Sequence, residues 1–259
     1  MSNTIDWGKI HYSSWSPETN LTGTGGSSFS NTKSIELDAV DDYVNVADAD
    51  NLSFGNGTTD SPFSISAWVK VTTNGQTILT KNDGTNAEYF FGKIGNLLFI
   101  QIYNNGSTSG RRNRYIDLSG YEGQWIHVVG AYNGQGGNVA ENGLRIYLNG
   151  TIQTGTTGRV NTYVAMNNTT APVEIGRIGT NYGEGHIDEL AVFDVELSAS
   201  DVTTIYNSGT PSDISSISGL VSWWRCGDGD TAPTLTDNGS GGNDGTMNNF
   251  STFSTDVPT

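Results

Sequence analysis

Short runs of alternating apolar and polar residues recur along most of this 259-residue chain. In the cleanest run every second residue from Phe63 to Val71 is apolar, which predicts a strand with one face in a core. Trp68 lies on the opposite face, so both faces of this strand are expected to be covered. Turn residues separate similar runs, which predict strands at 35–38, 42–46, 78–81, 88–94, 97–103, 124–132, 144–148, 151–153, 173–176 and 187–195.

One segment breaks this pattern and predicts a single short helix near residues 199–207. Ser198 and Asp201 are three residues apart, the spacing that a capping box requires. Val202 and Ile205 follow at helical spacing, and Gly209 is typical of a helix end. The pattern as a whole therefore predicts an all-β fold with one helix.

Four segments, in this order, resemble laminin G-like domains of the concanavalin A-like lectin/glucanase superfamily. They are an early core strand at 63–68, a central strand at 125–129, a hairpin at 146–150 and a last strand at 187–190, closed by the capped helix. The resemblance implies a jelly-roll sandwich of two antiparallel sheets. It also implies a lectin-like module, for which sugar binding is the common activity.

The two ends of the chain fall outside this pattern. Residues 1–32 are rich in Ser, Thr, Gly and Asn, and we interpret them as an arm before a sandwich that spans 33–210. Within 211–259, residues 219–246 resemble the family's opening strand and the loop that follows it. We expect a return segment that completes the sandwich, as in a circular permutation; donation of the strand to a neighbouring subunit is the alternative. The same segment resembles the C-terminal ends of laminin G-like proteins of marine tailed phages.

The charge of the chain narrows the choice of partners. A net charge of -15 argues against nucleic acid as a partner, because binding its phosphates needs Lys and Arg, and against an anionic membrane surface.

No apolar stretch approaches the ~20 residues of a membrane span, and the N-terminal residues lack a signal-peptide pattern. Cys226 is the only cysteine, so no internal disulfide forms, and we expect a small buried apolar group. A virion protein made in a host cytoplasm and released by lysis fits these observations.

Catalysis is not expected. Superfamily glucanases place three acidic residues along one strand, and residues 184–189 are the only candidate. Asp188 and Glu189 are adjacent there, and strand alternation points them to opposite faces. His127 lies within an apolar strand, so we expect it to be a structural histidine. The sequence therefore favours a protein that is not an enzyme.

A structural Ca²⁺ ion is the cofactor that the resemblance implies, because laminin G-like domains often hold one at the sandwich rim. Carboxylates are suitable ligands, and Asp38, Asp41 and Asp42 cluster before a strand. Asp188 lies on the closing strand, which this fold can bring nearby. The candidate metal ligands are therefore Asp41, Asp42 and Asp188. Ordinary acidic turns that cap backbone amides are the alternative.

Sugar binding needs aromatic faces beside hydrogen-bonding groups. Tyr103, Asn105 and Tyr182 lie on predicted loops of that composition and are the candidate carbohydrate-binding residues. Packing of each tyrosine onto the protein itself is the alternative.

Two groups of residues are candidates for assembly contacts. Trp7 and Trp15 are large apolar residues of the arm. The second group consists of Arg111, Arg112 and Arg114, which are three of the twelve basic residues of the chain. An acidic neighbour, such as another copy of this chain, is a suitable partner for the arginines. Tryptophans packed on the sandwich edge and a solvated strand face are the alternatives.

We hypothesise a non-enzymatic phage virion surface protein, either a capsid decoration or a fibre component, that binds cell-surface glycans. Its expected partners are other virion proteins and copies of itself. A stand-alone carbohydrate-binding module from a non-viral cell surface is the second hypothesis, and a polysaccharide-cleaving enzyme is the third.

Overall fold

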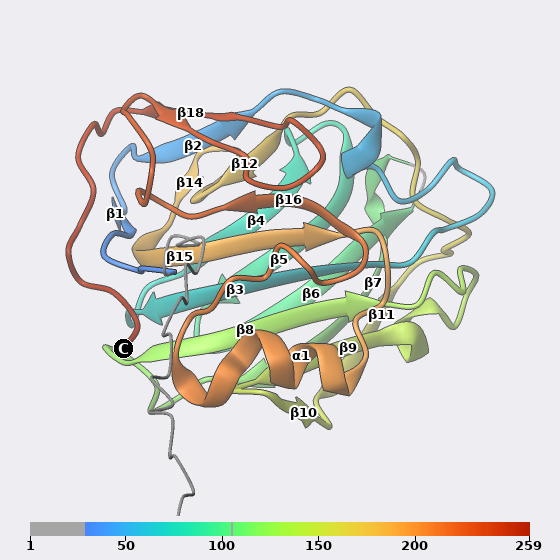
Figure 1. The fold of residues 1–259 in the computed structure, drawn as a ribbon. Coiled ribbons are helices and arrows are strands. Elements are labelled where there is room, and N and C mark those ends of the chain that lie inside the picture. Colours follow the sequence, from blue (N-terminus) through green and yellow to red (C-terminus); the bar gives the residue numbers. More distant parts are fainter. Residues whose placement is uncertain (1–28, 105) are drawn as a thin grey trace, which may run out of the picture.

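The computed structural model describes residues 29–104 and 106–259 and folds them into two packed antiparallel sheets (Figure 1). One sheet contains β1 (Ile35–Asp38), β15 (Glu184–Phe193), β3 (Phe63–Val71), β8 (Trp125–Tyr132), β9 (Leu144–Leu148) and β10 (Thr151–Gln153) in this order, with β16 (Leu220–Trp224) also paired to β15. The other contains β11 (Thr156–Val160), β7 (Ser107–Asp117), β6 (Leu97–Asn104), β5 (Ala87–Ile94), β4 (Gln76–Asn82), β12 (Val173–Ile175), β2 (Tyr43–Val46), β18 (Gly245–Asn248) and β17 (Thr234–Leu235). A separate hairpin pairs β13 (Arg177–Ile178) with β14 (Asn181–Tyr182). The predicted jelly-roll sandwich is confirmed.

The core lies between the two sheets, where strand alternation directs one apolar face of each. Phe63 on β3 packs against Tyr89 on β5, with ring centroids 5.2 Å apart, and stacks on Phe54 at 4.6 Å. Short 3₁₀ turns at η1 (Asp50–Leu52), η2 (Ala140–Gly143) and η3 (Asn207–Gly209) connect the strands. None of the described helices is long and apolar enough to cross a lipid bilayer.

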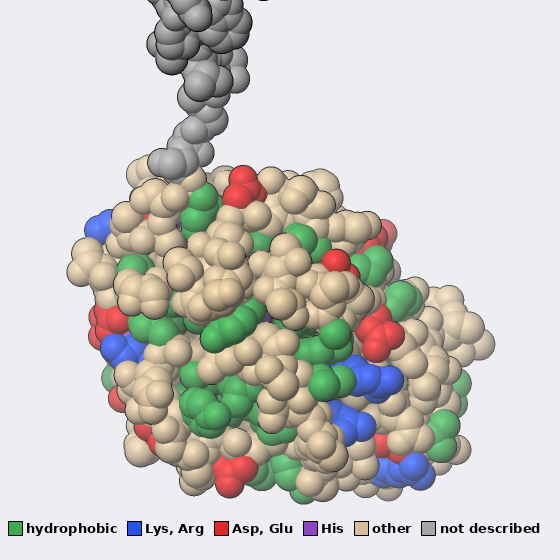
Figure 2. All heavy atoms as spheres, turned by 60° about the horizontal axis from the view of Figure 1, so that its bottom comes forward, with side chains coloured by type: hydrophobic (Ala, Val, Ile, Leu, Met, Phe, Trp, Pro, Cys, Tyr) green, Lys and Arg blue, Asp and Glu red, His purple; other side chains and the backbone are tan. Residues whose placement is uncertain are grey.

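The helix α1 (Ala199–Tyr206) covers the outer face of the seven-stranded sheet, and Figure 2 looks onto this side of the molecule. The predicted capping box is present: the Ser198 side chain accepts from the Asp201 amide, and the Asp201 carboxylate accepts from the Ser198 amide. The expected cover over Trp68 is also present, since its ring lies 5.8 Å from Tyr206 and 5.2 Å from His127. The predicted start of the helix and the predicted cover over Trp68 are therefore both observed.

The C-terminal segment lies within the same sandwich. β16 runs antiparallel to the second half of β15, and β18 pairs with β2 through Gly245 to Asn248 (Figure 1). Trp224 and Cys226 are fully buried in the main core, which bears out the expectation for the lone cysteine. Trp223 points to the other side of β16 and joins the apolar cluster under α1.

Candidate binding surface

The nine-stranded sheet presents aromatic and amide side chains on the face that points away from the core, which we call the outer sheet face. In β6, Leu98, Ile100 and Ile102 point into the core, so alternation turns Phe99, Gln101 and Tyr103 outward. The ladder to β7 places Tyr115 opposite Phe99, Asn113 opposite Gln101 and Arg111 opposite Tyr103. An ordered row of rings and amides therefore crosses two neighbouring strands.

Hydrogen bonds fix the polar members of this row. The Asn113 amide Nδ2 donates to Gln101 Oε1 at 3.2 Å, and Gln101 Nε2 donates to the Tyr103 hydroxyl at 2.6 Å. Burial raises the pKa of Tyr103, against smaller opposing contributions from Gln101, Arg111 and Asn82. Tyr103 therefore keeps its proton, and the row consists of uncharged hydrogen-bonding groups apart from Arg111.

The β13–β14 hairpin stands opposite Tyr103 and carries Tyr182. Arg177 on this hairpin is paired with Glu174 and lies over the Tyr43 ring, 3.5 Å from its centroid, and 6.0 Å from the Tyr182 centroid. Hydrogen bonding to Glu174 raises the pKa of Arg177, so the guanidinium stays charged. The cation–π contact of Arg177 with Tyr43 of β2 holds the hairpin against the nine-stranded sheet.

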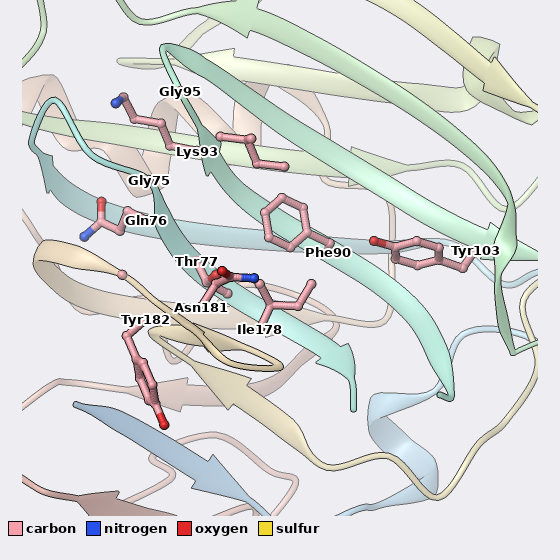
Figure 3. A pocket seen from close by; sticks show the side chains of 12 residues that line it. Gly75, Gln76, Thr77, Phe90, Lys93, Gly95, Tyr103, Ile178, Asn181 and Tyr182 are labelled. Carbon is pink, nitrogen blue, oxygen red and sulfur yellow. The ribbon is translucent and has the colours of Figure 1, made fainter. Parts of the chain in front are cut away.

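A pocket, which we call the hairpin pocket, lies between this hairpin and the outer sheet face. Tyr103 and Tyr182 both line it, and Figure 3 shows the Tyr103 hydroxyl pointing toward Phe90. Among the described residues that line it, Lys93 alone is charged, and its ammonium donates to the carbonyl oxygens of Thr72 at 2.8 Å and Asn74 at 2.9 Å. The other lining residues are Gly75, Gln76, Thr77, Phe90, Ile94, Gly95, Ile178, Asn181 and Gly183. Such a pocket suits an uncharged ligand that has both apolar and hydroxyl groups.

The structure thus brings two of the three predicted carbohydrate-binding residues to one pocket. Tyr103 belongs to β6, in agreement with the strand predicted at 97–103, whereas the loop expected at Tyr182 was wrong because Tyr182 belongs to β14. Asn105 lies outside the described residues. Sequence reasoning missed Phe90 and Ile178, whose apolar character resembled ordinary core positions and whose outward direction depends on strand register.

The two adjacent carboxylates of the closing strand are internal groups. A β-bulge between Asp188 and Ala191, with Glu189 at φ 47°, interrupts the alternation, and the expectation that Asp188 and Glu189 point to opposite faces is wrong. Asp188 stands opposite Trp68 and accepts from Asn31 at 2.9 Å on the outer face of the seven-stranded sheet, where Glu189 also accepts from Trp223 at 2.6 Å. Burial raises the pKa of Glu189 to about 7, and burial raises the pKa of Asp188 as well.

The predicted metal ligands do not all come together. Asp38, Asp41 and Asp42 offer carboxylate oxygens that lie within 4.8 Å of one another. Asp188 is excluded from this group because Ile187 pairs with Ile35 at the opposite end of β1 from Asp38. Burial and the charges of Asp38 and Asp41 raise the pKa of Asp42, a repulsion that a bound cation would relieve. The three-carboxylate cluster fits the ligand chemistry of Ca²⁺.

The three candidate assembly arginines do not share one face of β7, because Arg111 points outward and Arg112 and Arg114 alternate to the other side. Arg111 lies on the outer sheet face, whereas Arg112 is 2 % exposed and its guanidinium lies 3.3 Å from Glu141. A buried ion pair leaves Arg112 unavailable to a neighbouring subunit, so this part of the prediction is corrected. Arg114 lies at the rim beside β9, where its Nε donates to the Leu144 carbonyl at 2.7 Å. Trp7 and Trp15 lie outside the described residues.

Comparisons with known proteins agree with this fold. The family model described as concanavalin A-like lectin/glucanases superfamily, Laminin_G_3, matches residues 38–203. A candidate carbohydrate binding protein from Bacteroides ovatus ATCC 8483 is 19% identical at a TM-score of 0.59, over 89% of this chain and 62% of that chain. Two mutants of a protein named HCR/D are each 17% identical, with TM-scores of 0.50 and 0.51, over 68% of this chain and 42% of theirs. This chain therefore spans less than two thirds of these structures. No curated protein matches it.

Proposed function

Because the chain belongs to the concanavalin A-like lectin/glucanases superfamily, we propose that it binds glycans without cleaving them, as a surface protein of a phage virion. The observation that carries the glycan-binding part is the hairpin pocket. It combines Phe90, Tyr103 and Tyr182 with the amides of Gln76 and Asn181, and none of the described residues that line it carries a carboxylate. Sugars present hydroxyl groups around apolar C–H faces, and such a pocket can match both.

The burial and the hydrogen bonds of Asp188 and Glu189 on the closing strand support the proposal that the protein does not cleave glycans. A glycosidase needs two carboxyl groups about 5–10 Å apart on either side of the scissile bond. Glu189 is held by Trp223 and Arg225, and Asp188 is fully buried against Asn31. Neither lines one of the pockets described for residues 29–104 and 106–259. A cleaving enzyme remains the less favoured hypothesis, and release of reducing ends from glycans bound in the test below would establish it.

The virion part of the proposal rests on the resemblance of residues 219–246 to the ends of marine tailed-phage proteins. A decoration or fibre role implies contacts with other virion proteins or with copies of this chain. Mass spectrometry of purified particles tests this part, because a virion component is recovered at a fixed ratio to the major capsid protein. A chain that binds glycans as a monomer and is missing from particles would instead be a stand-alone carbohydrate-binding module.

A glycan array tests the binding part. We expect the wild-type protein to bind a restricted set of glycans, and Tyr103→Phe and Tyr182→Ala to weaken that binding about tenfold, the loss of one good contact. Tyr147→Phe removes the hydroxyl of a buried tyrosine in the other sheet and serves as the matched control. Binding that both pocket variants retain in full would place the glycan elsewhere.

A further inference from the structure

Two arginines converge in a groove at the rim of the sandwich, which we call the arginine groove. Its lining residues are Arg114, Asn142, Arg145, Ile152, Gln153 and Thr154, contributed by β7, β9, β10 and the loops beside them. The groove is therefore an electropositive site on a chain whose net charge is -15.

Backbone carbonyls, rather than carboxylates, hold the two guanidinium groups in position. Arg114 Nε donates to the Leu144 carbonyl at 2.7 Å, and Arg145 Nη1 donates to the same carbonyl at 3.2 Å. Arg114 also donates to the Thr154 carbonyl, and Arg145 donates to the Asn142 carbonyl at 2.6 Å. Because one oxygen serves both side chains, the two positive groups are neighbours.

Both guanidinium groups retain donors for a ligand. Arginine carries five N–H donors, and within the part of the chain that the structure describes the hydrogen bonds use Nε and Nη1 of Arg114 and Nη1 of Arg145. A guanidinium whose orientation is already fixed loses little entropy when it binds an oxyanion. The groove is thus preorganised for a group such as sulfate or carboxylate.

The positive charge of the groove is only partly neutralised. In the part of the chain that the structure describes, Arg145 pairs with the carboxylate of Glu196, 3.9 Å from Nε, and both side chains are about a third exposed. Glu141 is engaged by Arg112 and Arg159. Burial and the neighbouring charge of Arg145 lower the pKa of Arg114, as expected when like charges lie close together.

The groove continues toward the outer sheet face. Gln153 and Thr154 also line a second hollow, together with Leu97 and Tyr115 of that face. Asp117 also lines this hollow, where its carboxylate accepts from the Ser119 amide and hydroxyl. A ligand that lies across Tyr115 can therefore extend past Thr154 and place its anionic group at the arginine pair rather than beside Asp117. We propose that the arginine groove is the anion subsite of an extended glycan-binding surface, and that the glycans it selects carry sulfate or carboxylate groups. This inference rests on the proposed glycan binding and adds the class of glycan.

Three polymers with one backbone test the inference: dextran, dextran sulfate and carboxymethyl dextran, each titrated calorimetrically into the full chain. We expect saturable binding of at least one of the two anionic polymers, and the two arms tell which anion is preferred. Arg114→Gln/Arg145→Gln is expected to weaken that binding at least about tenfold, the loss of one charge-assisted contact. The net charge of -15 repels polyanions, so saturable binding reports a local site.

Matched variants keep the test decisive. Lys33→Gln/Lys70→Gln removes two positive charges away from the groove, one beside β1 at the sheet edge opposite β10 and one in β3 opposite Trp125, and should leave the binding unchanged. Arg145→Gln alone, at a side chain that is 33% exposed, serves if the double variant fails to fold. No binding of either anionic polymer, or binding that both groove variants retain, would overturn the inference. A change in oligomeric mass without a change in polymer binding would also overturn it, in favour of docking by a second acidic copy.

The two proposals fail in different ways. If the glycan array shows neutral glycans that depend on Tyr103 while the groove variants bind polyanions like the wild type, only the anion subsite is wrong. If no glycan of any charge binds, the proposed function itself fails.

Discussion

Trp223 donates its indole N–H to the Glu189 carboxylate at 2.6 Å, and this bond joins the C-terminal return to the closing strand of the sandwich. Glu189 also accepts from Arg225 at 3.2 Å, and the Arg225 guanidinium lies 4.4 Å from the centre of the Phe29 ring. Phe29 in turn stacks on Trp223 at 6.3 Å. One buried carboxylate therefore organises contacts among the beginning of the described chain, the closing strand and the C-terminal segment.

Trp223→Phe should lower the free energy of unfolding by about 3 kcal/mol, since it leaves a buried oxygen of Glu189 without its donor and removes packing volume. Urea unfolding at constant pH measures the change. Trp125→Phe is the matched control, because Trp125 also donates to a carboxylate, Asp256 at 2.7 Å, but that side chain is 39% exposed. The control should lose clearly less, and an equal loss in both variants would contradict the special role of the buried bond.

Glu189 should make the fold less stable as the pH rises. Its folded-state pKa is raised to about 7 from an ordinary 4.5, so the native chain holds a proton that the unfolded chain releases between these values. The free energy of unfolding is then highest below pH 4.5 with respect to this group and falls by on the order of 3 kcal/mol by pH 7. Asp188 shifts in the same direction.

Glu189→Gln isolates this contribution, because it removes the titration and keeps an oxygen for Trp223. Unfolding free energies measured from pH 4.5 to 7.5 should decline less steeply in the variant than in the wild type. Parallel curves would mean that Glu189 titrates normally in the folded protein.

His127 should lower the free energy of unfolding as the pH falls, which is the opposite pH dependence to that of Glu189. It is fully buried between Trp68 and Tyr206, its Nε2 lies 2.8 Å from Ser66 Oγ, and burial lowers its pKa from 6.5 to about 3. The unfolded chain therefore binds a proton below pH 6.5 that the native chain refuses, and stability is lost as the pH falls toward 3.

His127→Gln should flatten this acid-side loss, while Ser66→Ala should lower stability uniformly and keep its pH dependence. Thermal melts between pH 3 and 6.5 compare the two variants. If Ser66→Ala alone flattened the curve, the hydrogen bond rather than burial would control the histidine.

Local sequence signals predicted most of the fold because they act over a few residues. Alternation identified β3, and the spacing of Ser198 and Asp201 identified the cap of α1. The strand β7 was not predicted, because it carries Arg112 at a core-side position where an apolar residue is expected. The charge of Arg112 is balanced by Glu141, which comes from another part of the chain. Such a compensation depends on tertiary structure and leaves no periodic trace.

The candidate site was less predictable for the same reason. Tyr103 and Tyr182 were recognised by residue type, but only the order of β4, β5 and β6 and the position of the β13–β14 hairpin bring them to one pocket. Asp188 was grouped with Asp41 because the closing strand that carries Asp188 can run near the acidic cluster in this fold. The register of β1 against β15 then separates them, since Asp38 pairs with Glu184 and Ile35 with Ile187.

Calcium binding at Asp38, Asp41 and Asp42 remains a prediction with a direct test. Millimolar CaCl₂ should raise the melting temperature, and EDTA should reverse the rise, because the ion binds only the folded cluster. Asp41→Asn should abolish the response, whereas Asp83→Asn, in a turn on another loop, should retain it. The competing explanation is a self-contained turn, since Asp38 already accepts from the Val40 amide at 2.8 Å. In that case Asp41→Asn would raise stability without calcium by relieving repulsion at Asp42, and the metal would have no effect.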